Sequence, residues 1–485
     1  MKVWVTATAL GVMSLWGFWV QHGVSVASAQ DVPQVTDVVD IDWSIARDEL
    51  ARVMRGYLAV DTSNPPGREA AAVAYLGDLL TAEGIAWTSH AFAPGRENIV
   101  ARIRASGTGP HEAPLCLMSH LDVATAEAEA WVHPPFSGHL DDDGYIWGRG
   151  AIDMKSLGIV ELMTLVWIHR LEIPLNRDLI LLGVGDEEVD GAGAKYLIEH
   201  HWEDIGCSHL INEGGLGVRD ALVDGVTTFG ISYTEKGALW VKMIASGEPG
   251  HGSTPTGEEA TVRLMRALQR LERRKPRPKI PAGVYSLLHA VGEQAKGVTG
   301  GVLKRPGLVR LLAMRKILDN PLSRAMVTDT VNVTGFGGAE KPNVVPSEVW
   351  AQLDIRLLPG TEKDDILEEL AALVDDPKVR FEVLHFAPPA VSSMDDPVFH
   401  AFVANLERSF PGAAVGPLVM PGTTDSALFR PLGVQAYGMA PFVFELDDLR
   451  GMHGHDEKIR ATNLESGLRV FLGAVLDVSR VATSK

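Results

Sequence analysis

Histidine and carboxylate side chains recur along this chain in short motifs whose residue types suit metal-assisted hydrolysis. "SHLDV" contains His120 and Asp122, "GRGAIDMKS" contains Asp153, and "GVGDEEVDG" contains Glu187 and Glu188. Imidazole and carboxylate groups together bind zinc or a similar divalent ion, and hydrolytic sites leave one coordination position for water. A solvated acidic loop is the alternative for the last motif, because adjacent carboxylates repel and need water or a cation nearby.

The elements that must position these residues are indicated by the apolar pattern. Helical spacing covers residues 43–60 and 68–83, and later about 156–170 and 194–201. Between these helices lie the short apolar stretches "NIVARI", "LCLMSHLDV", "DLILLGVGD" and "HLINEG". Strands that alternate with helices predict an α/β fold with a doubly wound, mostly parallel sheet, in which sites form at the carboxyl ends of strands.

The polar motifs fall at those strand ends. His120, Glu187 and Glu213 each lie at the end of a predicted strand, and Asp153 lies at the start of a helix. From His120 through Asp153 and Glu187 to Glu213 the intervals are 33, 34 and 26 residues, each with room for one strand–helix unit. A solvated loop does not explain this coincidence. The spacing therefore favours a two-metal centre, in which one carboxylate bridges ions about 3.5–4 Å apart.

The neighbouring residues have roles that the same chemistry suggests. Asp122 can hold the His120 imidazole in one tautomer without itself binding metal. Of Glu187 and Glu188, one can bind metal while the other acts as the general base for a water molecule. The sequence contains neither a G-x-S-x-G nucleophile motif nor a Walker A loop.

These motifs, in this order, resemble those of the M20 metallopeptidases and amidohydrolases. The matching stretches are "SHLDV", "WVHPPFSGHLDDDGYIWGRGAIDMKS", "GDEEVDG", "NEGG", "GEPGHGSTP", "KPNVVPSEVWAQLDIRLLPG", "PGTTDSALFR" and "MHGHDEKI". "GRGAIDMKS" followed by "DEE" at this spacing is highly specific. The resemblance implies a hydrolase with two divalent metal ions, for which we expect Zn²⁺, with Co²⁺ or Mn²⁺ as alternatives.

The resemblance also implies the role of each residue. Glu187 corresponds to the general base, and Asp122 to the aspartate that clamps the first histidine. In the last motif His453 is favoured over His455, because it directly precedes the "G-x-D/N-E" segment. The implied metal ligands are His120 and Glu188 as terminal ligands, Asp153 as the bridging carboxylate, Glu213 as the second-metal carboxylate and His453 as the last ligand.

The family further implies a second domain inserted into the first. We expect catalytic-domain segments at 36–231 and 391–480 and an α+β lid or dimerisation domain at 232–390. In dimeric relatives the histidine of the "GHGS" motif, here His251, reaches the partner's active site and helps to polarise the substrate carbonyl. An ordinary turn with an exposed histidine is the alternative for this motif. The lid shows no internal repeat, which favours a homodimer over a monomer.

Four further residues resemble the family's substrate-binding positions. Asn343 and Arg356 correspond to lid residues that bind the substrate's carboxylate end, and a guanidinium fork suits that group. An ion pair within the lid is the alternative for Arg356. Gly422 and Thr423 in "PGTTD" correspond to a loop that closes on the substrate. Many relatives carry a basic residue where this chain has Ala427, which puts a contact there in doubt.

A long segment at about 276–324 exceeds what compact members need and resembles the carboxypeptidase S branch. Its stretch "RPGLVRLLAMRKIL" has a basic, apolar helix pattern. We expect a helix that packs on the lid, with a membrane-surface contact as the alternative.

Composition and the first residues bear on location and partners. The chain has 485 residues, 46% of them hydrophobic, and a formal net charge of −18 without a basic stripe, which argues against nucleic acid as a partner. Residues 1–29 have a signal-peptide pattern, so we expect export to the periplasm or medium, with an uncleaved anchor as the alternative. After cleavage we expect no stable membrane partner. Cys116 and Cys207 lie in apolar stretches, where cysteine is usually a buried small hydrophobe.

Together these features predict an amide hydrolase acting beside a free carboxylate, as a dipeptidase or carboxypeptidase on small peptides. An N-acyl-amino-acid amidohydrolase uses the same centre and is the first alternative. An apolar channel for an acyl tail, or an acceptor for a free amino terminus, would distinguish the two. A non-catalytic binding protein on the same fold is the second alternative, and the complete set of ligands and both glutamates argue against it.

Overall fold

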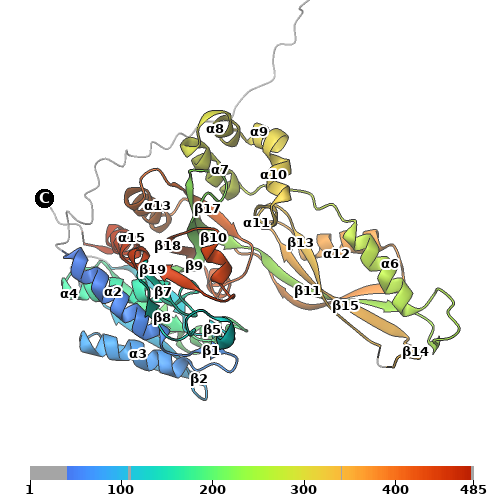
Figure 1. Ribbon diagram of the computed structural model, residues 1–485, viewed down its shortest axis with the longest axis horizontal. Coiled ribbons are helices and arrows are strands. Elements are labelled where there is room, and N and C mark those ends of the chain that lie inside the picture. Colours follow the sequence, from blue (N-terminus) through green and yellow to red (C-terminus); the bar gives the residue numbers. More distant parts are fainter. Residues whose placement is uncertain (1–40, 107–110, 340, 482–485) are drawn as a thin grey trace, which may run out of the picture.

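The computed structural model describes residues 41–106, 111–339 and 341–481 (Figure 1). The signal peptide expected at 1–29 lies outside these ranges. Within them, no helix combines the length and the apolar character needed to cross a membrane.

The larger part of the molecule is built on an eight-stranded mixed sheet with the order β17-β10-β18-β9-β4-β8-β3-β2. Neighbours β8, β4, β9 and β18 run parallel, as do β10 and β17, whereas β2 and β3 form an antiparallel edge. The predicted doubly wound, mostly parallel α/β fold is thus confirmed. The strands are β2 (Trp87–Ala93), β3 (Arg96–Ile103), β4 (Glu112–His120), β8 (Arg177–Val184), β9 (His209–Arg219), β10 (Thr227–Glu235), β17 (Ala414–Met420) and β18 (Gln435–Phe444).

Helices cover both faces of this sheet, which explains why its central strands read as continuous apolar runs. In β4, Leu115 and Leu117 belong to one core, while Cys116 and Met118 pack into another with α5. Burial raises the pKa of the Cys116 thiol, so this cysteine is no nucleophile. The helices are α2 (Trp43–Leu58), α3 (Glu69–Ala82), α4 (Lys155–Arg170), α5 (Ala192–Ile205), α13 (Pro397–Ser409), α14 (Ser426–Phe429) and α15 (Ala461–Ser479).

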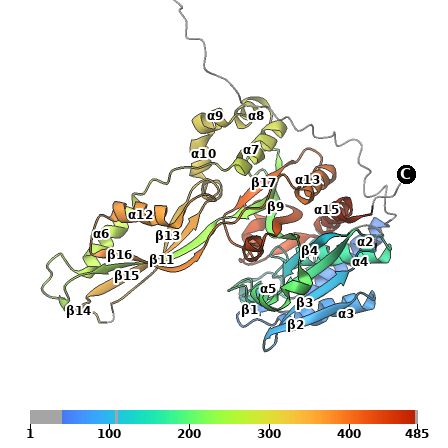
Figure 2. The same ribbon diagram turned by 180° about the vertical axis from the view of Figure 1, so that it is seen from behind.

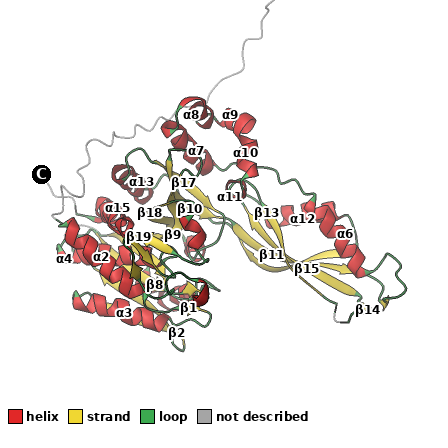
Figure 3. Cartoon of the chain, in the orientation of Figure 1, coloured by secondary structure: helices red, strands yellow, loops and turns green. Residues whose placement is uncertain are grey.

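A second, four-stranded antiparallel sheet projects from the main body as an elongated arm (Figures 1 and 3). Its order is β13-β15-β11-β16, and α6 and α12 pack on one face. A short pair, β12 with β14, lies at the far end of the arm. We call this part the lid. Its elements are β11 (Gly237–Ser246), β12 (Gly250–His251), α6 (Ala260–Glu272), β13 (Thr330–Gly337), β14 (Val344–Val345), β15 (Glu348–Leu357), α12 (Lys363–Val374) and β16 (Val379–Ala387).

The segment at 276–324 packs differently from our expectation. Val284 and Leu287 of its first helix belong to the core of the main body, and that helix lies along β17. Val309, in the stretch that we expected to pack on the lid, belongs to the same core, and Ile317 packs against it. Our prediction that this segment packs on the lid is therefore wrong. An amphipathic helix carries an apolar face but does not specify which of two sheets covers it. The helices of this helical insert are α7 (Ala282–Gln294), α8 (Gly297–Leu303), α9 (Pro306–Leu308), η2 (Val309–Ala313), α10 (Met314–Asp319) and α11 (Pro321–Ala325).

Small pairings complete the main body around the site. β1 (Ser63–Asn64) runs parallel to β5 (Val123–Ala124), directly after the β4 strand end. A three-stranded sheet joins β6 (His139–Leu140), β7 (Tyr145–Trp147) and β19 (Lys458–Arg460). Through it the segment before Asp153 lies beside the segment after His453.

One buried acid in α4 has a consequence for stability. Both carboxylate oxygens of Glu161 are buried without a hydrogen-bond partner, and burial raises the pKa of Glu161 well above its usual value. The folded state therefore binds more protons than the unfolded state above the ordinary glutamate pKa. The stability that protonated Glu161 allows is lost as the pH rises through this window.

We expect Glu161→Gln to make the stability of the protein less dependent on pH. Between about pH 5 and pH 8 the wild-type melting temperature should fall more steeply than that of the variant. At the upper end the variant should be more stable by roughly 1–3 kcal/mol, the usual penalty of an unsatisfied buried group. Differential scanning calorimetry across this range measures both slopes. The exposed Glu203→Gln is the control, and equal slopes in all three proteins would contradict the prediction.

Candidate metal centre

His120 ends β4 with its imidazole almost fully buried. Its Nδ1 lies 2.9 Å from the backbone carbonyl oxygen of Asp122, and its Nε2 lies 3.0 Å from Oδ1 of Asp153. When Nδ1 carries the hydrogen and donates it to that carbonyl, Nε2 has a free lone pair. The strand end therefore presents a metal-binding nitrogen to the carboxylates that gather beside it.

Two groups of side chains around Asp153 have the donor atoms of metal sites. His120, Asp153 and Glu213 form one group and Asp153, Glu188 and His453 the other, with ligand atoms within 4.8 Å of one another in each. Nε2 of His453 lies 3.1 Å from Oδ2 of Asp153 and 3.1 Å from Oε2 of Glu188. Each Asp153 oxygen faces a different histidine, so this carboxylate belongs to both groups and would suit a ligand shared by two bound ions. The structure thus brings all five sequence-predicted ligands together.

A buried glutamate that our sequence analysis did not single out joins the two parts of this centre. Glu457 is fully buried and accepts N–H groups of Gly150, Ile152 and Asp153 at 2.6–3.1 Å. Its other contact is an ion pair of 2.7 Å with Arg149. Glu457 therefore fixes the turn that carries Asp153. The sequence feature that could have identified Glu457 is its position four residues after His453, within the same motif.

Asp122 contacts both the imidazole and the acidic loop. Its carboxylate accepts the backbone N–H groups of Glu187 and Glu188 at 3.2 Å each and the Asn64 amide at 2.8 Å. Oδ1 of Asp122 is 3.7 Å from Nδ1 of His120, whereas the backbone carbonyl of Asp122 makes the hydrogen bond. The expected clamp thus acts mainly through the backbone, and the side chain positions the two glutamates. Asn64, from the turn "TSNPPG", was not foreseen.

Burial and neighbouring charges shift the pKa values of the carboxylates at this centre in opposite directions. Burial raises the pKa of Glu187 to about 8, and the charges of Asp425, Asp153 and Glu188 add to the rise, although His120 opposes it. Burial alone would raise the pKa of Asp153, but its hydrogen bonds with His120 and His453 outweigh it and hold the pKa below its usual range. So many carboxylates at one place attract cations strongly.

The donor set fits two divalent ions. It offers two imidazole nitrogens and three carboxylates, in two groups that share one carboxylate, which suits Zn²⁺ and similar ions. Glu187 lies beside this set, held by its backbone contact with Asp122 but outside both ligand groups. A carboxylate in this position would be close to bound ions without serving as a ligand.

Two of the four residues predicted to bind substrate meet at the junction of lid and main body. Nη1 of Arg356 in β15 donates to Oγ1 of Thr423 at 2.9 Å, while Nε pairs with Asp354 at 2.8 Å. The alternative of an ion pair within the lid is therefore also present. Thr424 donates its N–H and its hydroxyl to Glu235 at the end of β10, which fixes the loop of Gly422 and Thr423.

The other two lid residues with predicted roles, His251 and Asn343, lie far from this junction. His251 pairs with Val344 across β12 and β14, and Gly252 N–H donates to the Asn343 carbonyl at 3.1 Å. His251 is exposed, with its Nδ1 2.8 Å from Ser253 Oγ. Both opposite views show β14, the strand that pairs with β12, at the tip of the arm, away from the main body (Figures 1 and 2). The structure does not bring His251 and Asn343 to the metal ligands of their own chain.

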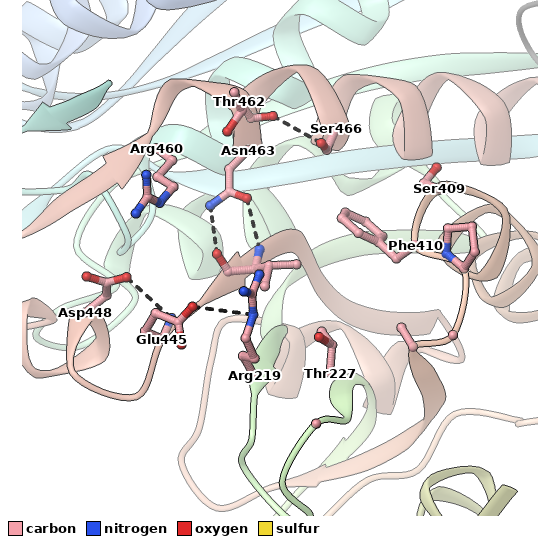
Figure 4. A pocket seen from close by; sticks show the side chains of 15 residues that line it. Arg219, Thr227, Ser409, Phe410, Glu445, Asp448, Arg460, Thr462, Asn463 and Ser466 are labelled. Atoms are coloured by element: carbon pink, nitrogen blue, oxygen red, sulfur yellow. Dashed lines mark hydrogen bonds and ion pairs between the residues drawn. The ribbon is translucent and has the colours of Figure 1, made fainter. Parts of the chain in front are cut away.

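A polar pocket of about 530 Å³ lies elsewhere on the main body (Figure 4). None of its lining residues is a predicted metal ligand. Arg219 pairs with Glu445 at 3.4 Å, and the guanidinium of Arg460 stacks over the Tyr145 ring at 4.2 Å. Because the pocket contains none of the predicted metal ligands or substrate-binding residues, we assign it no part in catalysis.

The mixed sheet with an inserted lid and the two His–carboxylate groups define a metallohydrolase type of site, and comparison with known proteins agrees. The chain belongs to peptidase family M20/M25/M40, whose model matches residues 116–477. It is therefore a hydrolase of the M20 peptidase family, as the sequence motifs predicted.

The similar proteins are named either as carboxypeptidases or as hydrolases of N-acyl amino acids. The chain is 29% identical to probable carboxypeptidase S-like 2 of Dictyostelium discoideum, over 72% of this chain and 69% of that protein. It is 30% identical to the human N-fatty-acyl-amino acid synthase/hydrolase PM20D1, over 75% and 74% of the two chains. It is 27% identical to aminoacylase-1 of Sus scrofa, over 86% and 92%.

Solved structures share the fold. The M20 family metallo-carboxypeptidase Sso-CP2 from Sulfolobus solfataricus superposes with a TM-score of 0.67 at 19% identity, covering 89% of this chain and 99% of that one. Human carnosine dipeptidase 1 gives a TM-score of 0.61 at 17% identity, over 90% and 97%.

Proposed function

We propose that this protein is a di-metal hydrolase that cleaves an amide bond beside a free carboxylate, as a dipeptidase or carboxypeptidase. The observation that carries the proposal is the pair of ligand groups that share Asp153, with Glu187 beside them. Bound divalent ions would supply Lewis acidity to the scissile carbonyl and to the attacking water.

The chain's own residues account for the remaining steps. Glu187 takes a proton from the attacking water and later delivers it to the nitrogen of the leaving amine. Asp122 holds the loop that carries this carboxylate, and Arg356, which contacts Thr423 at the junction, pairs with the substrate's carboxylate. Binding of that carboxylate competes with the Arg356–Asp354 ion pair, so substrate displaces an existing partner rather than meeting a free cation.

An N-acyl-amino-acid amidohydrolase is the second candidate, because relatives named aminoacylase-1 and N-fatty-acyl-amino acid synthase/hydrolase match over most of the chain. A purely binding protein is disfavoured by the complete set of ligands and by Glu187. To separate the candidates, the purified mature protein loaded with Zn²⁺ would be assayed against mixed dipeptides and N-acyl amino acids, with a chelator-treated sample beside it.

We expect cleavage of one substrate set, lost on chelation and restored by Zn²⁺, Co²⁺ or Mn²⁺. Cleavage of dipeptides supports the first candidate and cleavage of N-acyl amino acids the second. Absence of cleavage in both sets, with two ions bound per chain, would overturn the hydrolase proposal in favour of a binding protein.

We further propose that the protein works as a homodimer in which His251 acts on the partner's substrate. The support is the place of His251 at the tip of the arm, apart from its own metal ligands. Removing a donor to the developing oxyanion costs about 10²–10³-fold in turnover. We therefore expect His251→Ala to be nearly inactive alone, and Glu187→Gln as well, because it lacks the general base.

A hybrid dimer of these two variants tests whether His251 acts in the partner's active site. When co-expressed with different tags, a His251→Ala chain and a Glu187→Gln chain should form a dimer with one intact site and about half the wild-type activity, since a two-fold dimer has two equivalent sites. A hybrid as inactive as both parents would show that His251 serves its own chain. Undiminished activity of His251→Ala alone would show that His251 has no catalytic role.

We also propose that the protein is exported and that the segment 1–29 is removed. The support is the sequence pattern alone, with its small residues before the expected cleavage after Ala29. Intact-mass measurement of the protein recovered outside the cytoplasm should give a chain that begins at Gln30. A full-length chain in the membrane fraction would indicate an anchor instead.

A further inference from the structure

A cavity of about 340 Å³ lies between the helices α7, α8, η2, α10 and α11 of the helical insert and residues 221–223 of the main body. Ligand pockets for small molecules span about 300–1,000 Å³, so this volume lies within their range. The cavity shares no lining residue with the predicted metal ligands or with the substrate-binding residues. It is therefore a separate site, and the proposed hydrolase function leaves it unexplained.

The inner walls of the cavity are aliphatic. Val284, Leu287 and Leu288 line it from α7, and Met326 and Val327 line it from the end of α11 onward, all of them buried. Such walls offer no hydrogen-bond partner to a sugar, a nucleotide or a peptide backbone, each of which would lose its bonds to water there. They suit a hydrocarbon chain, since each buried methylene contributes about 0.8 kcal/mol.

The rim of the cavity differs from its walls. Val298 and Leu312 line it with 84% and 61% of their surface exposed, and the exposed Lys316 lies on the same rim. Single exposed apolar residues are common, but here they meet at the mouth of one cavity. Ser323 and Asn320, also on the rim, already bond within the insert.

The charge of the insert favours an anionic ligand at the rim. Residues 296–324 contain seven Lys or Arg and one Asp, in a chain whose formal net charge is −18. Lys316 makes no ion pair with any residue in the described ranges, whereas the adjacent Arg315 faces solvent and lies 3.9 Å from Asp319. An ammonium group without a partner, beside an apolar mouth, matches an anionic head on an apolar chain.

We propose that this cavity binds one long-chain carboxylate, with the hydrocarbon chain between α7 and α11 and the carboxylate at Lys316. The ligand enters as a single molecule from solution, and no bilayer is needed. The site is an accessory one, and its occupancy is measured by binding alone, so failure of the proposed hydrolase activity would leave this inference intact.

Direct titration with cis-parinaric acid, a fluorescent long-chain carboxylate, tests the site in the purified mature protein. We expect a saturable rise in fluorescence with one site per chain, displaced by palmitate. Hexadecanol, which has the same chain length without the charge, should displace the probe about tenfold less well. Equal displacement by palmitate and hexadecanol would overturn the role of Lys316.

Matched variants locate the site. Val302→Trp fills the cavity and should weaken probe binding at least about tenfold, with Ala313→Phe as a second filling variant should the first fold poorly. Lys316→Gln should weaken binding of the carboxylate about tenfold and leave hexadecanol binding unchanged. Arg315→Gln, the neighbouring exposed cation, should change neither. Metal content and melting temperature report on folding in each variant.

Two results would overturn the proposal. Unchanged binding in both filling variants would place the probe elsewhere. Equal losses in Lys316→Gln and Arg315→Gln, together with binding to phosphatidylglycerol vesicles that is insensitive to Val302→Trp, would mean that the basic rim contacts an anionic membrane surface instead.

Discussion

The Glu187→Gln variant should lose between about 10² and 10⁴ in kcat while it keeps its full metal content, the range expected when a general acid–base group is removed. Glutamine preserves the shape of the side chain and the backbone contact with Asp122 but cannot take a proton from water. Glu187 belongs to neither ligand group, so its replacement leaves every predicted ligand in place. Stopped assays and elemental analysis of the same desalted sample give both quantities.

Two control variants test whether the effect is specific to Glu187. Glu188→Gln removes a ligand and should lose metal, whereas Asp190→Asn in the same loop, paired with Lys195 at the surface, should change neither metal content nor kcat by more than a small factor. Loss of metal in Glu187→Gln with retention in Glu188→Gln would mean that base and ligand are the reverse of our assignment.

The second large effect is expected for Asp153→Asn, which should reduce metal content at both positions and abolish measurable turnover. Each carboxylate oxygen of Asp153 faces one ligand group, and asparagine offers a single oxygen with no charge. The loss of affinity should exceed the roughly 10- to 100-fold that follows from removing an outer hydrogen-bonding partner of a ligand.

Comparison with neighbouring variants tests the bridging role. Glu213→Gln removes a ligand from one group only and should leave one ion per chain, measured by elemental analysis after dialysis against metal-free buffer. Glu457→Gln leaves all ligands in place and should weaken metal binding within the smaller range. Retention of one ion in Asp153→Asn would show that this carboxylate serves one position only.

The main sheet and the ligand set were predictable because they depend on local patterns. β4 and β8 are apolar on both faces, and the residues that follow them must lie at the same sheet edge. Family motifs then identified His453, which spacing alone could not select among 16 histidines. Glu457 and Asn64 were missed because their roles depend on contacts between segments far apart in the chain.

The helical insert shows a second limit of sequence patterns. Its apolar face was visible, but the choice of partner sheet depends on which surface the completed fold leaves uncovered. Arg356 shows a third limit. The alternative of an ion pair within the lid is present, since Arg356 pairs with Asp354, whereas its role in substrate binding stays a prediction; its contact with Thr423 crosses the junction. A long side chain with several donors can serve a lid and a substrate loop at once.

The order in which the ligands leave the ribosome follows from their places in the chain. His120, Asp153 and Glu213 are all synthesised before the lid begins, whereas His453 emerges 240 residues after Glu213. Glu457, which fixes the turn of Asp153, emerges four residues later still. Throughout synthesis of the lid, a nascent chain therefore contains every residue of one ligand group but lacks Glu457, and the second group cannot form until translation has passed residue 453.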